Sequence, residues 1–310
     1  MTRTNSSLVN ATVRYPAGAQ VVIVHGGVDM EPIDSTYTVL DLAANEGWSA
    51  LSAGARGVEA GVRAVGVLED HPAFNAGYGA VLTGHGTVET DGAVADGSTR
   101  RSAGVGAVPG LRNPAALALQ LLEHSDAALL VGDSALQFAI EHGFTAEDLT
   151  TAEQRDALNE VLTNAGASVF TGRRVATETV GCIIVEGGRI SVAASTGGLV
   201  GKLPGRVGDA SIPGAGFWAD ERVGVLCSGS GEASIRSLMS FVVAGRVREF
   251  GLQEALSRTV REVMESSAEA IAAVVAVDVQ TSEIATAHCG SSFPVSVLDA
   301  STATHLGIVL

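Results

Sequence analysis

Apolar and polar residues along the 310-residue chain form short runs typical of buried strands and longer stretches with helical spacing. The run Val21–Val24 ends at a His-Gly-Gly turn, as a strand entering a tight loop does. From about Asp34 to Leu68 the chain is rich in alanine with helical spacing, interrupted near Gly54 and Gly61, which predicts two helices. Polar and apolar residues alternate between Gly86 and Val108, and this alternation predicts a pair of strands.

The middle of the chain is dominated by helix signals. Asn113 is in position to cap a helix whose first residue is Pro114. Ala128–Val131 predicts a short buried strand, and Asp133 is the expected cap of the next helix. Residues 145–178 are polar, begin with helical spacing and end rich in glycine and arginine, so we expect an exposed linker.

The pattern changes abruptly at residue 179. Val180–Val185 and Ile190–Ala194 predict a hairpin closed by Glu186-Gly187-Gly188. Helices are expected at Glu232–Glu249 and then along Leu252–Met264, where the apolar residues share one face. Further strands are predicted at Val223–Leu226, Ile271–Asp278, Glu283–His288 and Phe293–Leu298. This order suits a single α+β domain over 1–310, with helices covering a largely antiparallel sheet as in a four-layer αββα sandwich.

Composition and motifs narrow the function. A net charge of −15 disfavours nucleic acid or an anionic membrane surface as partner, and no apolar stretch of about twenty residues could span a bilayer. The first twenty residues have no apolar core segment, and the three cysteines have no CxxC spacing, so we expect a cytoplasmic protein with reduced thiols. HExxH, Walker and GxSxG motifs are all missing from the sequence. Conventional metal or serine hydrolysis therefore has little support.

Two glycine-rich segments could bind a small charged molecule. Cys227–Glu232 lies between a predicted strand and a predicted helix, but it lacks the third glycine of a dinucleotide loop, so an anion cradle is the better interpretation. Arg206 and Asp209 lie three residues apart in a second loop and could clamp the α-carboxylate and α-ammonium of an amino acid. A surface salt bridge is the alternative for this pair, and for Arg206 alone it is the favoured one.

Taken in order, these segments resemble the plant-type L-asparaginase / isoaspartyl peptidase family, whose members are N-terminal-nucleophile hydrolases. The resemblance runs from about residue 21 to 250. It rests on His25-Gly26-Gly27, Leu68–Gly77, Leu111-Arg112-Asn113-Pro114, Thr179-Val180-Gly181, Ser195-Thr196-Gly197-Gly198, Lys202–Asp209 and Ser228-Gly229-Ser230-Gly231-Glu232. It implies self-cleavage of the Glu178–Thr179 bond into an α-subunit (1–178) and a β-subunit (179–310). Thr179 would then supply the nucleophilic hydroxyl, and its freed amine, with an ordinary pKa of ~7.7–8.0, the base.

The resemblance also implies roles for the surrounding residues. Thr196 would orient or assist Thr179, while Ser228 and the Gly229 N–H would form the oxyanion hole. Arg206 and Asp209, with Gly229 and Gly231 nearby and Asn75 in support, would bind the aspartyl group. The implied substrate is an amino acid such as L-asparagine, or a β-aspartyl dipeptide. The implied assembly is a homodimer of cleaved αβ units.

No catalytic cofactor is expected, but the resemblance implies a structural sodium held by main-chain oxygens. The loop residues concerned are Leu68, Glu69, His71, Phe74, Ala76 and Tyr78. Glu178 stands where the asparaginases usually have glycine, Ser228 stands where threonine is common, and the C-terminal sixty residues depart from the family pattern. Two alternatives therefore stay open: the same mechanism on another N-substituted asparagine-like amide, or an uncleaved, inactive binding homologue.

Overall fold

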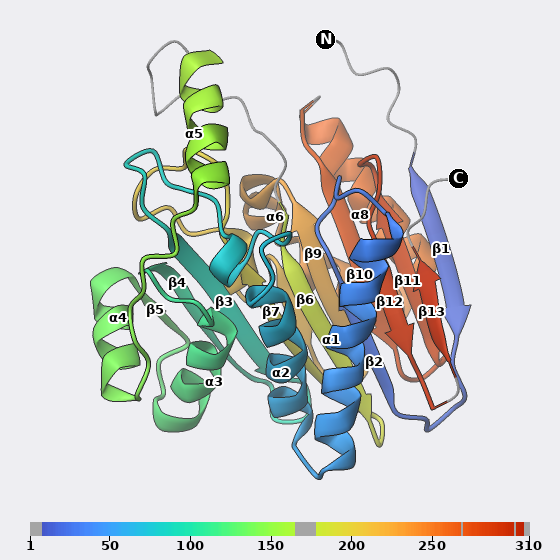
Figure 1. The fold of residues 1–310 in the computed structure, drawn as a ribbon. Helices are drawn as coiled ribbons and strands as arrows, with labels where there is room; N and C mark the ends of the chain where they lie inside the picture. The colour runs from blue at the N-terminus through green and yellow to red at the C-terminus, as the bar shows by residue number, and fades with distance from the viewer. Residues whose placement is uncertain (1–7, 165–177, 268, 301, 307–310) are drawn as a thin grey trace.

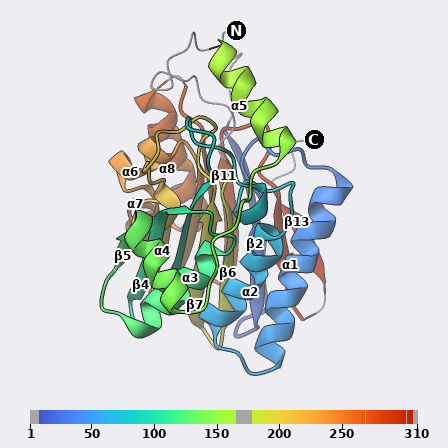
Figure 2. The same cartoon turned by 60° about the vertical axis from the view of Figure 1, so that its left-hand side comes forward.

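A computed structural model describes residues 8–164, 178–267, 269–300 and 302–306, and in this part of the chain two β-sheets face one another between two layers of helices (Figures 1 and 2). The eight-stranded sheet has the order β13 (Ala303–Leu306), β12 (Val295–Leu298), β2 (Val21–His25), β6 (Val180–Glu186), β7 (Arg189–Thr196), β3 (Glu89–Asp96), β4 (Arg101–Pro109), β5 (Leu129–Val131). The five-stranded sheet has the order β1 (Val9–Arg14), β11 (Glu283–His288), β10 (Ala272–Asp278), β9 (Val223–Gly229), β8 (Phe217–Ala219). All pairs are antiparallel except β4 with β5. The predicted α+β class and αββα sandwich are confirmed.

Small residues let the outer helices lie close to the eight-stranded sheet. The helices that cover it are α1 (Asp34–Ser52), α2 (Gly57–Glu69), α3 (Pro114–His124) and α4 (Gly132–Glu141). A Cβ added at Gly61 in α2 would lie 3.5 Å from the Ala193 Cβ on β7, and one at Gly47 in α1 would lie 3.2 Å from Val22 Cγ1. Such close contact brings the helices onto the sheet in a chain that has only 4% aromatic residues.

Two further apolar layers complete the sandwich. Side chains from both sheets meet in a central core that includes Ile23, Ile183, Val275 and Phe293. The outer face of the five-stranded sheet is covered by α7 (Met239–Phe250) and α8 (Leu252–Ser266), with the short α6 (Gly231–Ser237) at its edge. The predicted apolar face of the Leu252–Met264 segment is the face of α8 that packs on β10 and β11.

Two predicted helices have different boundaries. The single helix expected at Glu232–Glu249 is broken into α6 and α7 at Leu238, which has a left-handed backbone with φ 49°. This conformation is costly for a residue with a side chain, and sequence propensity does not predict it. Gly61 was expected to interrupt a helix but lies inside α2. Because glycine has no side chain, α2 can lie close to the sheet at this position.

Helix capping also differs from the prediction. Asn113 precedes α3, but its side chain donates to Glu69 Oε2 at 3.0 Å instead of accepting a hydrogen bond from the helix. The buried Glu69 carboxylate takes the capping role, because its Oε1 accepts from the Ala115 N–H at 3.1 Å. Asp133 is likewise not a cap and lies in the first turn of α4. The strand expected to be buried at residues 128–131 is an exposed edge strand, β5.

The segment expected to be an exposed linker begins with packed structure. It contains α5 (Ala152–Asn164), and Leu149 and Leu158 are buried against Leu82 and Val88. Residues 165–177, which hold the rest of the predicted linker, lie outside the described residues.

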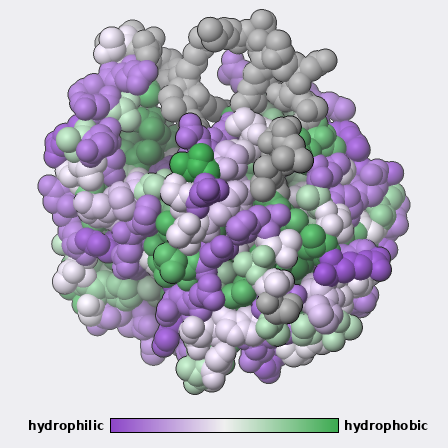
Figure 3. All heavy atoms as spheres, turned by 45° about the vertical axis from the view of Figure 1, so that its right-hand side comes forward, coloured by the Kyte–Doolittle hydropathy of each residue, from purple (hydrophilic) through white to green (hydrophobic). Residues whose placement is uncertain are grey.

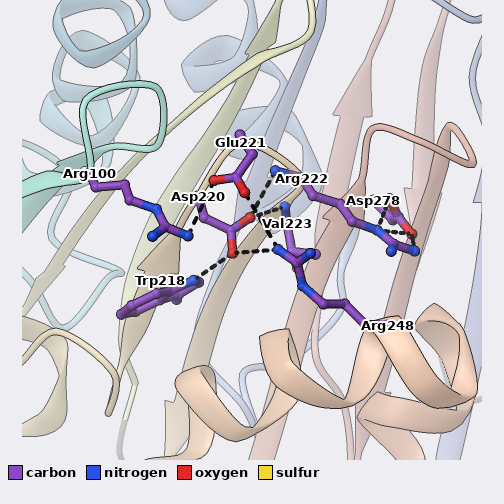
Figure 4. Close-up of polar contacts among 8 residues, drawn as sticks. All are labelled: Arg100, Trp218, Asp220, Glu221, Arg222, Val223, Arg248 and Asp278. Carbon is purple, nitrogen blue, oxygen red and sulfur yellow. Dashed lines mark hydrogen bonds and ion pairs between the residues drawn. The ribbon is translucent and has the colours of Figure 1, made fainter.

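Charged side chains are concentrated at the end of the sandwich where β9 begins (Figure 4). The buried Asp278 pairs with Arg222 at 2.8 Å, and Asp220 accepts hydrogen bonds from the backbone of Arg222 and Val223, both at 2.8 Å. This network fixes the β8–β9 turn. None of the described helices has the length and apolar character needed to cross a membrane, and on the face shown in Figure 3 apolar side chains form small patches among polar ones.

Candidate active site

The predicted nucleophile lies at the start of β6, beside the end of β7. Thr179 directly precedes β6 and is 4% exposed. Antiparallel pairing of Val180 with Ser195 brings the neighbouring Thr196 next to the Glu178–Thr179 peptide. The Thr196 hydroxyl donates to the Glu178 carbonyl oxygen at 2.8 Å and accepts from the Gly198 N–H at 3.0 Å. In the intact chain, Thr196 therefore contacts the carbonyl of the bond expected to break.

The Glu178 side chain is enclosed beside this bond. It packs on Gly27, where a Cβ would lie 2.3 Å from the Glu178 Cβ, so only glycine leaves room for it. Burial raises the pKa of the Glu178 carboxyl to about 7, aided by the nearby Asp29, whereas a hydrogen bond from the Asn75 backbone acts in the opposite direction. Near neutral pH this carboxyl is therefore present in both its protonated and its ionised form, one residue before the predicted nucleophile.

Asn75 joins three parts of the site. Its side-chain amide donates to the Gly198 carbonyl at 2.8 Å, and its Oδ1 accepts from the Val81 N–H at 3.0 Å. Its own carbonyl accepts from the Gly197 N–H at 2.8 Å. Because both ends of the amide are engaged within the protein, Asn75 supports the loop after β7.

Arg206 and Asp209 converge at the start of α6. A Cβ added at Gly231 would lie 2.8 Å from Arg206 Nη2 and 2.9 Å from Asp209 Oδ1. Asp209 is 3% exposed, and its Oδ2 has no hydrogen-bond partner among the described residues. Burial raises the pKa of Asp209 to about 6, although Arg206 lowers it. The two side chains do not form an ion pair with each other, so the surface-salt-bridge alternative does not apply to them.

Arg206 pairs instead with Glu232, whose Oε1 accepts from Arg206 Nε at 3.0 Å. Glu232 lies in the first turn of α6, where an acid also favours the helix dipole. In the structure it holds the guanidinium from one side and leaves Arg206 Nη2 facing Gly231. The loop thus presents one positive and one negative group to the same small space.

Three buried charged residues beneath this loop were missed by sequence reasoning. Asp91 on β3 accepts from the Gly208 N–H and the Ala107 N–H, both at 2.7 Å. Glu89, two residues earlier, accepts from the Gly205 N–H at 2.8 Å. Lys202 is the only lysine in the sequence, donates to the Glu89 carbonyl at 2.8 Å, and has its pKa lowered by burial. The sole sequence signal was the alternation of two acids in a strand otherwise buried.

Ser228 and Gly229 end β9 close to the loop after β2. Ser228 Oγ accepts from the Val28 N–H at 3.2 Å, which ties the hydroxyl to that loop. Gly229 has φ 125°, and a Cβ there would lie 2.3 Å from the Ile271 carbonyl oxygen. Glycine is required at this position because both the backbone conformation and the contact with β10 exclude a side chain.

The loop predicted to hold sodium follows α2 in three tight turns. Three backbone hydrogen bonds define these turns. The His71 N–H donates to the Leu68 carbonyl at 3.2 Å, the Phe74 N–H to the His71 carbonyl at 3.3 Å, and the Ala76 N–H to the Phe74 carbonyl at 2.8 Å. The Tyr78 carbonyl accepts from Gln154 Nε2 at 3.2 Å. Each of these carbonyl oxygens retains a second lone pair. The Glu69 carboxylate is not available to a cation, because it caps α3.

Side chains of the usual metal ligands do not gather at this site. Among the described residues, no three histidine, cysteine, aspartate or glutamate side chains lie together as a metal-binding group. His25 is buried at the end of β2, and burial lowers its pKa to about 4, so its ring is neutral near pH 7. The groups at the scissile bond are therefore hydroxyls, backbone amides and one carboxyl.

Comparison with known proteins identifies the family of the chain. The family model described as asparaginase matches residues 17–308. The plant-type L-asparaginase of Pyrococcus abyssi is 36% identical over 73% of this chain and 79% of its own length. The isoaspartyl peptidase of Escherichia coli is 34% identical over 79% of this chain and 83% of its own. The isoaspartyl peptidase/L-asparaginase of Xenopus laevis is 35% identical over 72% and 74% respectively. The chain therefore belongs to the asparaginase family of N-terminal-nucleophile hydrolases.

Proposed function

We propose that this protein cleaves its own Glu178–Thr179 bond and then uses Thr179 to hydrolyse L-asparagine and β-aspartyl peptides. The observation that carries the first step is the hydrogen bond from Thr196 Oγ1 to the Glu178 carbonyl oxygen at 2.8 Å. It polarises that carbonyl and stabilises the negative charge that forms on its oxygen when a hydroxyl attacks the carbon. The adjacent Thr179 carries such a hydroxyl in a buried setting.

Self-cleavage creates the catalytic pair. Thr179 Oγ1 attacks the Glu178 carbonyl carbon, the C–N bond breaks as the nitrogen takes a proton, and water opens the resulting ester. The freed α-amine of Thr179 has an ordinary pKa of ~7.7–8.0, so a sizeable fraction is neutral near pH 8. It can then take the proton from the Thr179 hydroxyl as that oxygen attacks a substrate amide.

Substrate binding is assigned to the loop after β7. The Arg206 guanidinium would pair with the α-carboxylate of an aspartyl group and the Asp209 carboxylate with its α-ammonium, around the space that Gly231 leaves open. In this proposal the β-carbonyl lies at Thr179, and Ser228 and the Gly229 N–H form its oxyanion hole. The names of the relatives favour L-asparagine and isoaspartyl peptides as substrates.

Three further features stay predictions from the resemblance. A structural sodium would be held by main-chain oxygens of the loop after α2, where it would stiffen the loop that carries Asn75 without entering any reaction step. Two cleaved units would pair as a homodimer. A cytoplasmic location is expected.

The proposed activity is tested with purified, aged protein. Ammonia should be released from L-asparagine and free aspartate from β-aspartyl-leucine, whereas the isomeric α-aspartyl-leucine should stay intact because its aspartyl α-carboxyl forms the peptide bond and cannot pair with Arg206. Protein that processes neither L-asparagine nor the β-linked dipeptide would contradict the proposal.

Gly231→Ala should weaken substrate binding without stopping self-cleavage. The new methyl group would lie within 3 Å of both Arg206 Nη2 and Asp209 Oδ1, so one of them must move. We expect KM for L-asparagine to rise roughly tenfold or more, since catalysis depends on a closely held substrate. Gly245→Ala in α7 is the matched control, because a Cβ there meets no atom within 4 Å. Equal KM values for the two variants would argue against the assigned clamp.

The pH dependence of kcat/KM should include the titration of Asp209. Its carboxyl must be ionised to pair with the α-ammonium, and its raised pKa of about 6 means that this form is lost as the pH falls below 6. We expect kcat/KM for L-asparagine to lose roughly tenfold per pH unit there, in addition to the loss from protonation of the Thr179 amine. The Asp209 contribution should be missing from kcat, because a bound ammonium keeps the carboxylate ionised. Profiles of both constants check this, and an Asp209 contribution of the same size in kcat would contradict it.

A further inference from the structure

A cavity of about 160 Å³ lies at the end of the sandwich opposite the predicted nucleophile. It opens where the β6–β7 hairpin, the end of β3 and the start of α2 meet, at the lower end of the molecule in Figure 1. Thr179 directly precedes β6 and Glu186 ends it, so the strand places the cavity roughly 23 Å from Thr179. Neither Arg206 nor Asp209 belongs to its walls. The cavity is therefore separate from the proposed active site.

The start of α2 contributes two backbone N–H groups to the cavity wall. Gly57 and Val58 are the first two residues of α2, and both line the cavity. A helix has no internal acceptor for its first N–H groups, and within the described part of the chain no other group accepts from these two. The positive end of the helix dipole adds to their preference for a negatively charged group. This wall therefore suits a carboxylate.

Ser191 on β7 is an independent indication that a ligand binds here. Its side chain is 8% exposed and lines the cavity. Its Oγ lies 2.7 Å from the point that a Cβ on Gly57 would occupy, so the hydroxyl is beside the start of α2. Among the described residues this hydroxyl has no hydrogen-bond partner, although leaving a buried hydroxyl unpaired is costly. It is thus placed to donate to a group bound at the start of the helix.

The cavity walls carry charges of both signs. Arg56 and Arg189 are basic members, and Asp96 and Glu186 are acidic ones. Arg56 is engaged by two glutamates outside the cavity, and Arg189 pairs with Glu186 at 3.3 Å. Asp96 Oδ1 accepts from the Ser98 N–H at 2.9 Å, which leaves Oδ2 for another donor. A ligand with a negative charge alone would meet these acids, so the walls suit a molecule that also carries a positive charge.

We propose that this cavity binds a small neutral α-amino acid, such as glycine or L-alanine, in its zwitterionic form. The carboxylate of the ligand would accept from the Gly57 and Val58 N–H groups and from the Ser191 hydroxyl. Its ammonium would pair with Asp96 and Glu186. At about 30 Å³ per water molecule, the cavity has room for about five waters, which is close to the size of glycine. The acidic wall disfavours a second carboxylate, so L-aspartate should bind poorly here. This site does not depend on the proposed function.

Equilibrium dialysis with radiolabelled glycine tests the site. Arg206→Ala removes the proposed clamp, so any saturable binding of glycine that this variant retains cannot come from the clamp. We expect it to bind one glycine per chain, with acetate and methylamine competing roughly tenfold more weakly than glycine or worse, because each carries only one of the two charges. Absence of saturable glycine binding in Arg206→Ala would overturn the inference. Competition by acetate as strong as that by unlabelled glycine would also overturn it, since the site would then be an anion site.

Ser191→Ala, made in the Arg206→Ala protein, locates the binding in this cavity. The change should leave the fold intact, because the hydroxyl has no partner within the described residues, and the melting temperature without ligand checks this. The Kd for glycine should rise roughly tenfold or more, since the carboxylate loses a charge-assisted hydrogen bond. Ser52→Ala is the matched control, because Ser52 is exposed at the end of α1 and lies outside the cavity. A Kd for Ser191→Ala within twofold of that for Ser52→Ala would overturn the assignment.

Discussion

Replacing Thr179 with alanine is expected to abolish both self-cleavage and hydrolysis of L-asparagine. The variant lacks the hydroxyl of the residue that directly follows the Glu178 carbonyl, so the acyl shift to residue 179 cannot occur and no threonine with a free amine is formed. Loss of a nucleophile that also provides the base should cost on the order of 10⁴-fold or more in kcat, because such groups act as a unit. Gel analysis of the aged protein and ammonia release measure the two effects.

Thr179→Ser is the matched control for this prediction. It keeps the hydroxyl and loses only a methyl group, so the variant should still cleave itself and turn over L-asparagine, although more slowly because serine is less restricted about χ1. A Thr179→Ala preparation that hydrolyses L-asparagine as well as the serine variant would remove Thr179 from the mechanism.

Arg206→Ala should cause the second largest loss, and it should affect substrate turnover alone. The guanidinium is only 14% exposed and faces the space left by Gly231, so the α-carboxylate of the substrate would lose a charged partner in a largely dry site. Truncating one member of such a pair typically costs about 2–5 kcal/mol, and we expect kcat/KM for L-asparagine to fall roughly 10²–10³-fold. Self-cleavage should continue, because Arg206 does not contact the Glu178–Thr179 peptide.

Two further variants define the role of Arg206. Arg206→Lys should recover little of the lost activity, since an ammonium cannot form the two parallel hydrogen bonds of a guanidinium. Arg189→Ala removes a 66% exposed arginine from the β6–β7 turn and should behave as wild type. A kcat/KM for Arg206→Ala within twofold of that of Arg189→Ala would contradict the clamp.

The sheets and most helices could be predicted from the sequence because their signals are local. The β6–β7 hairpin follows from two apolar runs separated by Gly187 and Gly188, both of which adopt the positive φ that such a turn requires. The break at Leu238 has no such signal, since leucine rarely adopts a φ of 49° and nothing in the local sequence marks it. The capping of α3 by Glu69 also escaped prediction, because it joins residues 46 positions apart in sequence.

Most of the candidate site was predicted by resemblance to a family, and residue chemistry alone indicated only the Arg206–Asp209 clamp and the anion cradle at Cys227–Glu232. Arg206, Asp209 and Gly231 are far from Thr179 in sequence, and only the fold brings the first two to the space beside the third. The supporting roles of Glu89, Asp91 and Lys202 were not predicted, because their hydrogen-bond partners are backbone groups distant in the sequence. Glu178 illustrates the converse: its position at the scissile bond was clear from the sequence, but its enclosure by Gly27 and its raised pKa depend on tertiary structure.

The measurement that tests the central claim most directly is intact mass combined with N-terminal sequencing of aged, active protein. Self-cleavage predicts two chains, of which the second begins Thr-Val-Gly at residue 179. Fully active protein that contains only one species near 31.4 kDa, with no new N-terminus at Thr179, would contradict it.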